Sequence, residues 1–476
     1  MNNSAGESCM TTMTQNILQT GEADLPSLAH EPAWLSSYRK EAISVFRSSR
    51  AEPNPLYTKY EQMTKFDPSG ISLARNPVLS DRIPDRYAEM GDSSLFMLHS
   101  GGSVFKTGSV PNGVIFEELG EAARKYPDIF ERYFKRKGLR PQDDIYVALN
   151  NSLFTSGFFL KVEKNTVLDT PVHIVHIEDS PGKAQFQQNI IMMNEGSSAN
   201  VTEEILSVEN FNEKSLFSTV TDVILDQGAV LHHASLENLS AGSIFLSNKR
   251  AVAGRDSRIH WVSSYMGADI TRARADTDFT GQGASTEDYE ILFGNGSQKF
   301  DIVTDLHHNV ESTSGRITVR SVLKGKSRAL LRGMIRIGEK AGNTNAYLAE
   351  HGMLLSKDAK CDAIPGLEIL TNGVKATHSA SVSQMDEQQL YYLQTRGLDR
   401  NEAEKLLVLG FFDPVISRIP IDTVRDKMRF QIEDKWNNVI SLQTSRHLDE
   451  LEFEKYVKDQ IKGPGESIFE GHYKYR

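Results

Sequence analysis

The stretch LKGKSRALLRGMIRIGEKAGNTNAYLAEHGMLLSKDAKCDAIPGLEILTNGVKATHSASV, residues 323–382, decides the fold of this chain. Short apolar or alternating runs are separated by turns rich in Gly, Asn, Asp and Lys, which predicts strands. The same form, a turn residue followed by a short strand that holds small or polar residues, occurs in LDQGAVLHHASL, VAGRDSRIHWV and FTGQGASTEDYEIL. Many short strands with stacked corners favour a β-helix over a sandwich.

Helical spacing precedes this β region. EPAWLSSYRKEAISVFRSS places Trp34, Tyr38 and Val45 near helical spacing. GVIFEELGEAARKYPDIFERYFKRKG, residues 113–138, predicts a second helical stretch that is broken at Pro127. The N-terminal part is therefore expected to be mostly helical.

Helical spacing also returns after the β region. Asp386 is a candidate N-cap and Gly397 a candidate stop for a first helix, and Asp399 is a candidate N-cap for a second. DTVRDKMRFQIEDKWNNVI and HLDELEFEKYVKDQIKG predict further helices. We therefore divide the chain into a flexible tail (1–30), an N-terminal helical region (31–150), a β-helix core (151–384) and a C-terminal helical region (385–476).

The composition excludes several classes of protein. The net charge is -10, without the clustered excess of Lys and Arg that binding to nucleic acid requires. No apolar run approaches the ~20 residues that span a membrane, and the polar N-terminus lacks the pattern of a secretory signal. Cys9 and Cys361 are the only cysteines, which excludes a disulfide framework and favours a reducing cytoplasm.

The turn KGKSR imitates the end of a phosphate-binding loop through Gly325, Lys326 and Ser327. Arg320 stands where the first glycine of that loop is required, and the surroundings predict strand, turn and strand. A basic turn between coils is the favoured interpretation, so any nucleotide hydrolysis would fall to a partner.

Cys361 and His378 raise the question of a metal site, because thiolate and imidazole are both good ligands for iron or zinc. Two ligands do not close a four-ligand site within one chain. A buried apolar cysteine and a hydrogen-bonded histidine are the alternative interpretation of the two residues.

Two pairs of neighbouring histidines lie in the β region, His232 with His233 and His307 with His308. Adjacent residues of a strand point to opposite faces, so at most one member of each pair would face a given site. Structural use is the favoured interpretation of all four.

Several of these segments together resemble the SufB/SufD proteins of iron–sulfur cluster assembly. The similarity runs through EPAWLSSYRKEAISVF, DIYVALNNSLFTSGFFLKVEKNTVLDTPVHI, the β segment from His307 to Ile369, and VKATHSASVSQMDEQQLYYLQTRGLDRNEAEKLLVLGFF. It covers most of the chain beyond the tail. The last two segments are the most specific evidence for the resemblance, because a distinctive β segment is followed there by the C-terminal helical region.

The resemblance implies a mainly β fold, a right-handed parallel β-helix core flanked by N-terminal and C-terminal α-helical regions. Members of the family pair through their β-helices, here with a SufB-type paralogue or with an identical subunit, and their C-terminal helices bind the SufC ATPase. They act as scaffold or accessory subunits rather than as enzymes. Iron or an iron–sulfur cluster would be held transiently between subunits, fed by a sulfur donor system, with no permanently bound cofactor.

The resemblance also implies where partners meet this chain. In SufB the segment that matches KATHSAS has Glu on both sides of the histidine, whereas His378 lies between Thr377 and Ser379, which is closer to SufD. Cys361 falls close to the cysteine that SufB brings to the subunit interface, but not squarely upon it. Cys361 and His378 could therefore meet residues of a partner subunit on late coils. The candidate contacts with the ATPase are Tyr391, Tyr392, Arg396 and Leu407, although a helix that packs on its own domain would look the same.

Two other functions stay open at the level of the sequence: a cytoplasmic structural β-helix adaptor without metal, and a polysaccharide-active β-helix enzyme. Copurification with an ATPase separates the assembly subunit from the enzyme. Binding of iron or sulfide separates the assembly subunit from the adaptor.

Overall fold

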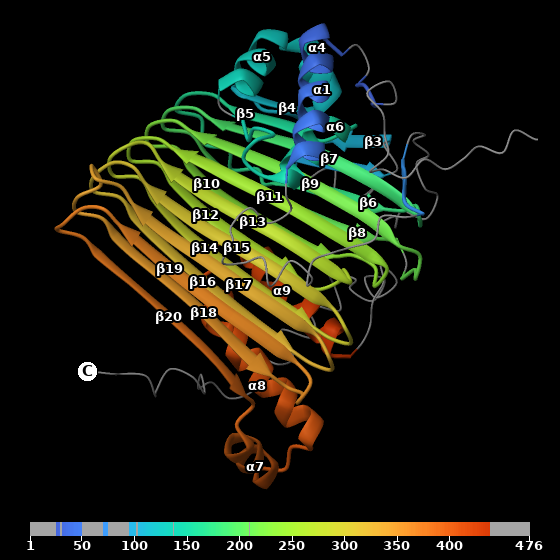
Figure 1. The fold of residues 1–476 in the computed structure, drawn as a ribbon, viewed down its shortest axis with the longest axis vertical. Helices are drawn as coiled ribbons and strands as arrows, with labels where there is room; N and C mark the ends of the chain where they lie inside the picture. Colours follow the sequence, from blue (N-terminus) through green and yellow to red (C-terminus); the bar gives the residue numbers. More distant parts are fainter. Residues whose placement is uncertain are drawn as a thin grey trace, which may run out of the picture.

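The computed structural model describes residues 25–28, 31–49, 70–74, 95–100, 103–136, 138–208 and 210–437. They form a parallel β-solenoid with helices at both ends of the sequence (Figure 1), which confirms the expected fold class. No helix in this part of the chain is long and apolar enough to cross a membrane.

Two sheets form the walls of the solenoid, and every coil contributes one strand to each. The odd sheet consists of β4 (Val114–Glu118), β5 (Phe158–Val162), β7 (Lys183–Met193), β9 (Ser215–Leu225), β11 (Ser243–Ala253), β13 (Ile270–Phe279), β15 (Lys299–His308), β17 (Arg328–Ile337) and β19 (Lys360–Ile369), with β1 (Ser72–Leu73) paired to β7. The even sheet consists of β3 (Ser103–Thr107), β2 (Leu95–Ser100), β6 (Val172–Glu178), β8 (Ser198–Ser207), β10 (Val230–Asn238), β12 (Arg258–Tyr265), β14 (Ser285–Gly294), β16 (Ser314–Leu323), β18 (Asn345–Leu354) and β20 (Lys375–Gln384). All neighbours in the two sheets are parallel except β2 with β3 and β4 with β5.

Successive coils stack in register. Ser285 of β14, for example, pairs with Arg258 of β12 and with Ser314 of β16. Because paired residues of parallel strands share a face, each position of a coil generates a column of side chains along the solenoid. The inward columns are mostly aliphatic, aromatic and alanine side chains, which form the main core between the sheets.

One corner of each coil is a residue with a left-handed backbone conformation, two positions before an even strand. Backbone hydrogen bonds stack these corners, for example from the Gly196 amide to the Gln227 carbonyl and from the Gly228 amide to the Arg255 carbonyl, both 2.8 Å. Gly, Asn and Asp adopt this conformation at least cost, which explains the turn residue before each short strand in the sequence. The corner residues are Gly196, Gly228, Asp256, Gly283, Ser312, Asn343 and Gly373.

The interior also holds a buried polar row in the N-terminal coils. The Nδ1 atoms of His99 and His176 lie 3.1 Å apart. Glu203 lies 3.3 Å from His176 Nε2 and 2.6 Å from His233 Nε2, and it accepts a 3.1 Å hydrogen bond from the Asn189 amide. Burial alone would raise the pKa of Glu203, but the two imidazoles outweigh it and lower this pKa to about 2.

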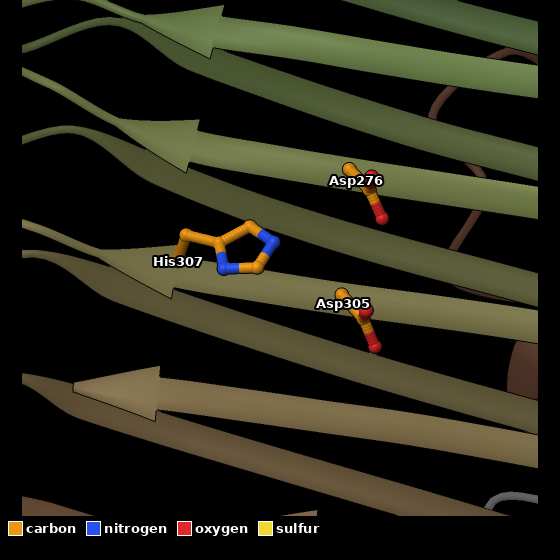
Figure 2. Close-up of side chains that lie close together, drawn as sticks. All are labelled: Asp276, Asp305 and His307. Carbon is orange, nitrogen blue, oxygen red and sulfur yellow. The ribbon is translucent and has the colours of Figure 1, made fainter. Parts of the chain in front are cut away.

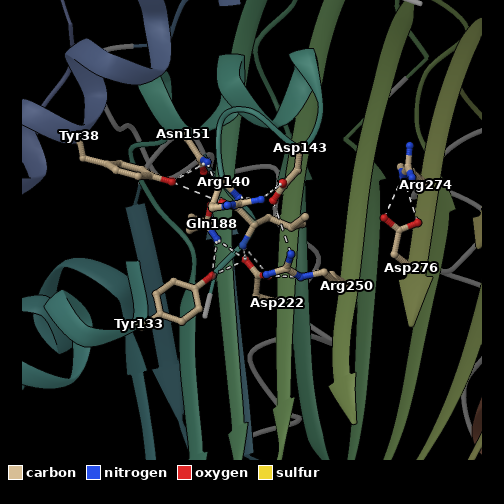
Figure 3. Close-up of polar contacts among 11 residues, drawn as sticks. Tyr38, Tyr133, Arg140, Asp143, Asn151, Gln188, Asp222, Arg250, Arg274 and Asp276 are labelled. Carbon is tan, nitrogen blue, oxygen red and sulfur yellow. Dashed lines mark hydrogen bonds and ion pairs between the residues drawn. The ribbon is translucent and has the colours of Figure 1, made fainter. Parts of the chain in front are cut away.

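The N-terminal helices cover the outer face of the odd sheet (Figure 1). The Tyr133 hydroxyl and the Leu139 amide donate hydrogen bonds to Asp222 of β9, and Arg250 of β11 lies 3.5 Å from Asp143 (Figure 3). Burial raises the pKa of Asp222 to about 6. These polar contacts join the helices to the sheet. Apolar side chains of the helices and of the sheet form a second core between them, separate from the main core. The helices are α1 (Ala33–Ser48), α4 (Leu119–Lys125), α5 (Pro127–Arg136) and α6 (Ile145–Leu153).

Strands occupy part of the N-terminal region that the sequence analysis expected to be helical. The helix expected from Gly113 begins only at Leu119, because Val114 and Phe116 alternate into the main core as β4, antiparallel to β5. β2 and β3 lie in the same region of the sequence. Alternate residues of these segments are buried against the first coils, and this burial stabilises a strand more than their helical propensity stabilises a helix.

The C-terminal helices are α7 (Glu387–Thr395), α8 (Arg400–Ile416) and α9 (Asp422–Trp436). Asp386 and Asp399 are their N-caps as expected, and Asp399 forms a capping box with Glu402. α8 and α9 pack on the outer face of the even sheet. The helix expected at residues 447–463 and most of the expected tail lie outside the described residues.

We predict that Glu203→Gln lowers the free energy of unfolding at pH 7 and flattens its dependence on pH. The pKa of Glu203 is depressed in the folded state, so its stabilisation is present above pH ~4.5 and is lost as pH falls toward ~2. The shift corresponds to about 3 kcal/mol. Urea titrations between pH 3 and 7 measure this, with Glu195→Gln at an exposed ion pair as the control. Parallel pH profiles of the wild type and Glu203→Gln would contradict the prediction.

Candidate functional site

The last coil, β19 with β20, is an open end of the solenoid (Figure 1). In the described part of the chain β19 pairs only with β17, and β20 only with β18. Each strand therefore presents an edge of unpaired backbone groups, which is a template for pairing with another chain. β20 is exposed along nearly its whole length, and Leu370 (59% exposed) and Val382 add apolar surface beside it.

Cys361 lies near the start of β19 and points into the interior, where it belongs to the main core. Its Sγ atom lies 3.5 Å from Ser321 Oγ. A Cβ atom on Gly352 would stand 2.9 Å from this sulfur, so the absence of a side chain there makes room for the thiol. Burial raises the pKa of Cys361 to about 11, and the thiol is therefore protonated at neutral pH.

Glu350 of β18 is a second buried ionisable group at this end of the interior, 1% exposed. Burial raises its pKa to about 8, and its charged form in turn raises the pKa of Cys361. The sequence analysis missed Glu350. Its alternation with Ala346 and Leu348, which are buried in the main core, is the signal that places it on the inward side of the strand.

His378 lies on β20, where it pairs in register with Leu348 of β18. Leu348 is fully buried in the main core, so His378 stands on the inward side of its strand. It is nevertheless exposed, because no further coil follows β20 in the described part of the chain.

The structure places Cys361 and His378 on one coil, the first inside it and the second at its open surface. Neither belongs to a group of three or more metal-ligating side chains in the described residues. The two carboxylates of β19 are engaged elsewhere: Asp362 pairs with Lys360 at 2.9 Å, and Glu368 pairs with Arg336 at 3.1 Å. This coil therefore offers at most a partial set of ligands.

The residues expected to contact an ATPase lie on and after α7, which projects beyond the solenoid (Figure 1). Tyr391 is 70% exposed, Tyr392 is also exposed, and the Arg396 guanidinium stacks over the Tyr392 ring at 5.1 Å. Leu407 is half-buried in α8, whereas its neighbour Leu406, which the sequence analysis did not select, is exposed. The exposed side chains form an aromatic and apolar surface that the described residues leave uncovered.

Comparison with known proteins finds two family models in this chain. The model described as SUF system FeS cluster assembly, SufBD core domain, matches residues 176–411, and that of the SufBD protein N-terminal region matches residues 101–174. The iron–sulfur cluster assembly protein SufD of Bacillus subtilis is 30% identical over 415 residues, which cover 85% of this chain and 94% of that protein. An iron–sulfur cluster assembly SufBD family protein of Staphylococcus epidermidis is 27% identical over 438 residues, 86% of this chain and 90% of that protein.

We predict that Gly352→Ala lowers the free energy of unfolding by about 1–3 kcal/mol, because the added methyl group overpacks the site of the Cys361 thiol. Urea denaturation measures the effect. Gly342→Ala is the matched control, since a Cβ atom there has no neighbour within 4 Å. An equal change in both variants would show that the thiol is not tightly packed.

Proposed function

Because this chain belongs to the SufBD family of iron–sulfur cluster assembly proteins, as a SufD-like member, we propose that it is a non-catalytic subunit of a cytoplasmic cluster-assembly scaffold. In this proposal it pairs through its solenoid with a SufB-type subunit or with a second copy of itself. It also binds a SufC-type ATPase, which hydrolyses the nucleotide. Iron and sulfide are cargo, held transiently between subunits.

The open last coil is the observation that carries this proposal. Among the described residues, β19 and β20 each end a sheet with one unpaired edge; Leu370, just after β19, and Val382, on β20, are exposed. Helices cover large parts of the two outer faces of the solenoid. Pairing of a second solenoid with this coil would satisfy the free backbone groups and bury the apolar side chains.

The ligands on this coil support a site shared between subunits. Cys361 and His378 supply a sulfur and a nitrogen donor, and a metal ion in a closed site usually takes four ligands. The remaining ligands would come from the partner. The thiol must lose its proton to bind a metal, so we expect the positive charge of the incoming cation to lower the pKa of Cys361, against the effect of burial.

The surface of α7 and α8 supports binding of the ATPase. Exposed aromatic side chains are typical of interface hot spots, and the stacking of Arg396 on Tyr392 orders part of this surface before binding. α7 projects beyond the solenoid and α8 packs on the outer face of the even sheet, so the ATPase and the second subunit can occupy separate places (Figure 1).

We predict that Cys361→Ala and His378→Ala each lower the iron and acid-labile sulfide content of the complex. The chain is coexpressed anaerobically with SufB- and SufC-type partners, and metal and sulfide are measured in the purified complex. His351→Ala is the matched control, because His351 lies on the neighbouring strand β18 and hydrogen-bonds Ser381.

Loss of iron or sulfide from an intact complex of either variant would support the site, provided that the His351→Ala complex keeps its iron and sulfide content. Unchanged content in both variants would overturn it and would leave this chain as a structural partner. A complex without iron or sulfide in the wild type would favour the adaptor function instead.

We predict that the double substitution Tyr391→Ala with Tyr392→Ala weakens binding of the ATPase by about 10-fold or more, because it removes the exposed aromatic anchors. Calorimetric titration with the purified ATPase measures the affinity. Leu370→Ser tests the other surface: it should weaken pairing of the subunits and leave the affinity for the ATPase unchanged. Equal affinity for the ATPase in the tyrosine variant and the wild type would contradict the assignment of this surface.

A further inference from the structure

A grid of metal-ligating side chains lies on the outer face of the odd sheet, away from the last coil. Asp276 and Asp278 project from β13, and Asp305 and His307 project from β15. The strands are parallel and in register, with Asp276 beside Asp305 and Asp278 beside His307. Residues two apart on a strand share a face, so the four side chains form a two-by-two grid.

Three of the four donors already lie close together. One ligand atom each from Asp276, Asp305 and His307 falls within 4.8 Å of the others, and Figure 2 shows the three side chains on the same face of neighbouring strands. A single ion that is bonded at about 2.1–2.5 Å holds donors at separations up to about 4–5 Å. The spacing is therefore that of ligands around one ion, after small changes of rotamer.

The grid has an excess of negative charge. Arg274 is its direct counter-ion, with its Nε atom 2.9 Å from Asp276 and its Nη2 atom 3.1 Å from Asp305 (Figure 3 shows the first pair). Asp278 is attracted by the charges of His307 and Arg250, which lower its pKa against the larger effect of burial. Arg274 thus faces two of the three carboxylates directly, and Arg250 acts on the third.

The other cations nearby have partners of their own. Arg250 lies within ion-pair distance of Asp143 and Asp222, and Arg336 pairs with Glu368. Burial raises the pKa of Asp305, and the negative charge of Asp276 raises it further. Burial likewise raises the pKa of Asp278.

We propose that Asp276, Asp305 and His307, with Asp278 beside them, bind one divalent transition-metal ion of the class of Mn²⁺ or Fe²⁺. Carboxylate oxygens together with one imidazole nitrogen suit ions of intermediate hardness. His307 distinguishes the grid from an ordinary acidic patch, because its ring places a nitrogen donor within 4.8 Å of the two carboxylate oxygens. Arg274 then remains as a neighbour that orients the carboxylates.

This site is distinct from the site proposed on the last coil. Cys361 and Glu350 point into the interior, whereas the grid stands on the outer face, on strands that precede β19 of Cys361 by two and three positions in the odd sheet. An ion here would link β13 to β15 across one coil boundary. The inference therefore does not depend on cluster assembly.

Titration of the full-length protein with Mn²⁺, followed by electron paramagnetic resonance, tests the proposal. Mn²⁺ is the probe because it prefers oxygen and nitrogen to thiolate. We expect one tightly bound ion per chain and a ¹⁴N coupling from an imidazole in the pulsed spectrum. His307→Gln should abolish that coupling and weaken binding by about 10- to 100-fold.

His260→Gln is the matched control, because His260 lies 3.4 Å from the carboxylate of Glu287 on the outer face of the even sheet but in no three-ligand group. It should keep both the affinity and the coupling. Absence of a bound ion in the wild type would overturn the proposal and would leave the grid to the neighbouring arginines as counter-ions. Retention of the coupling in His307→Gln, or its loss in His260→Gln, would also overturn it.

Discussion

Pairing of each coil with the next, in parallel and in register, is the constraint on which the rest of the structure depends. It requires that every coil turn at the same place, and the left-handed corner residues from Gly196 to Gly373 meet this requirement. Ser312 is the exception among Gly, Asn and Asp, and the left-handed conformation there costs about 1–2 kcal/mol. Once the corners are aligned, each residue lies beside its equivalent in the neighbouring coils. Side chains at equivalent positions therefore form columns along the solenoid.

The columns explain how an ionisable group can be stabilised inside the solenoid, because the neighbouring coils place partner side chains beside it. Glu203 is stabilised by imidazoles from β6 and β10, the strands on either side of its own. Glu350 has no such partner, and burial raises its pKa to about 8. The difference lies in what the neighbouring coils supply. Near the end of the stack fewer neighbours remain, so the groups there are the ones that a second chain can influence.

The two outer faces of the solenoid have different roles. Helices bury large parts of both, through an apolar core of their own on each side. Where β13 and β15 carry Asp276, Asp278, Asp305 and His307, the odd sheet instead holds a charged grid. The same register that stacks apolar residues inside brings these like charges together outside, and only part of their charge is balanced by Arg274.

The sequence by itself determined the β-solenoid, its flanking helices, the helix caps at Asp386 and Asp399, and the resemblance to the SufB/SufD family, because these rest on local turn chemistry, periodicity and segment order. It also identified Cys361 and His378 as candidates, which remain a prediction. It did not separate the strands β2 to β4 from helix, since their strand conformation depends on burial against distant coils. Nor could it select Glu350 or pair Asp276 with Asp305 and His307. The tertiary structure decided those points, because only the register between coils brings residues of different strands within reach of one another.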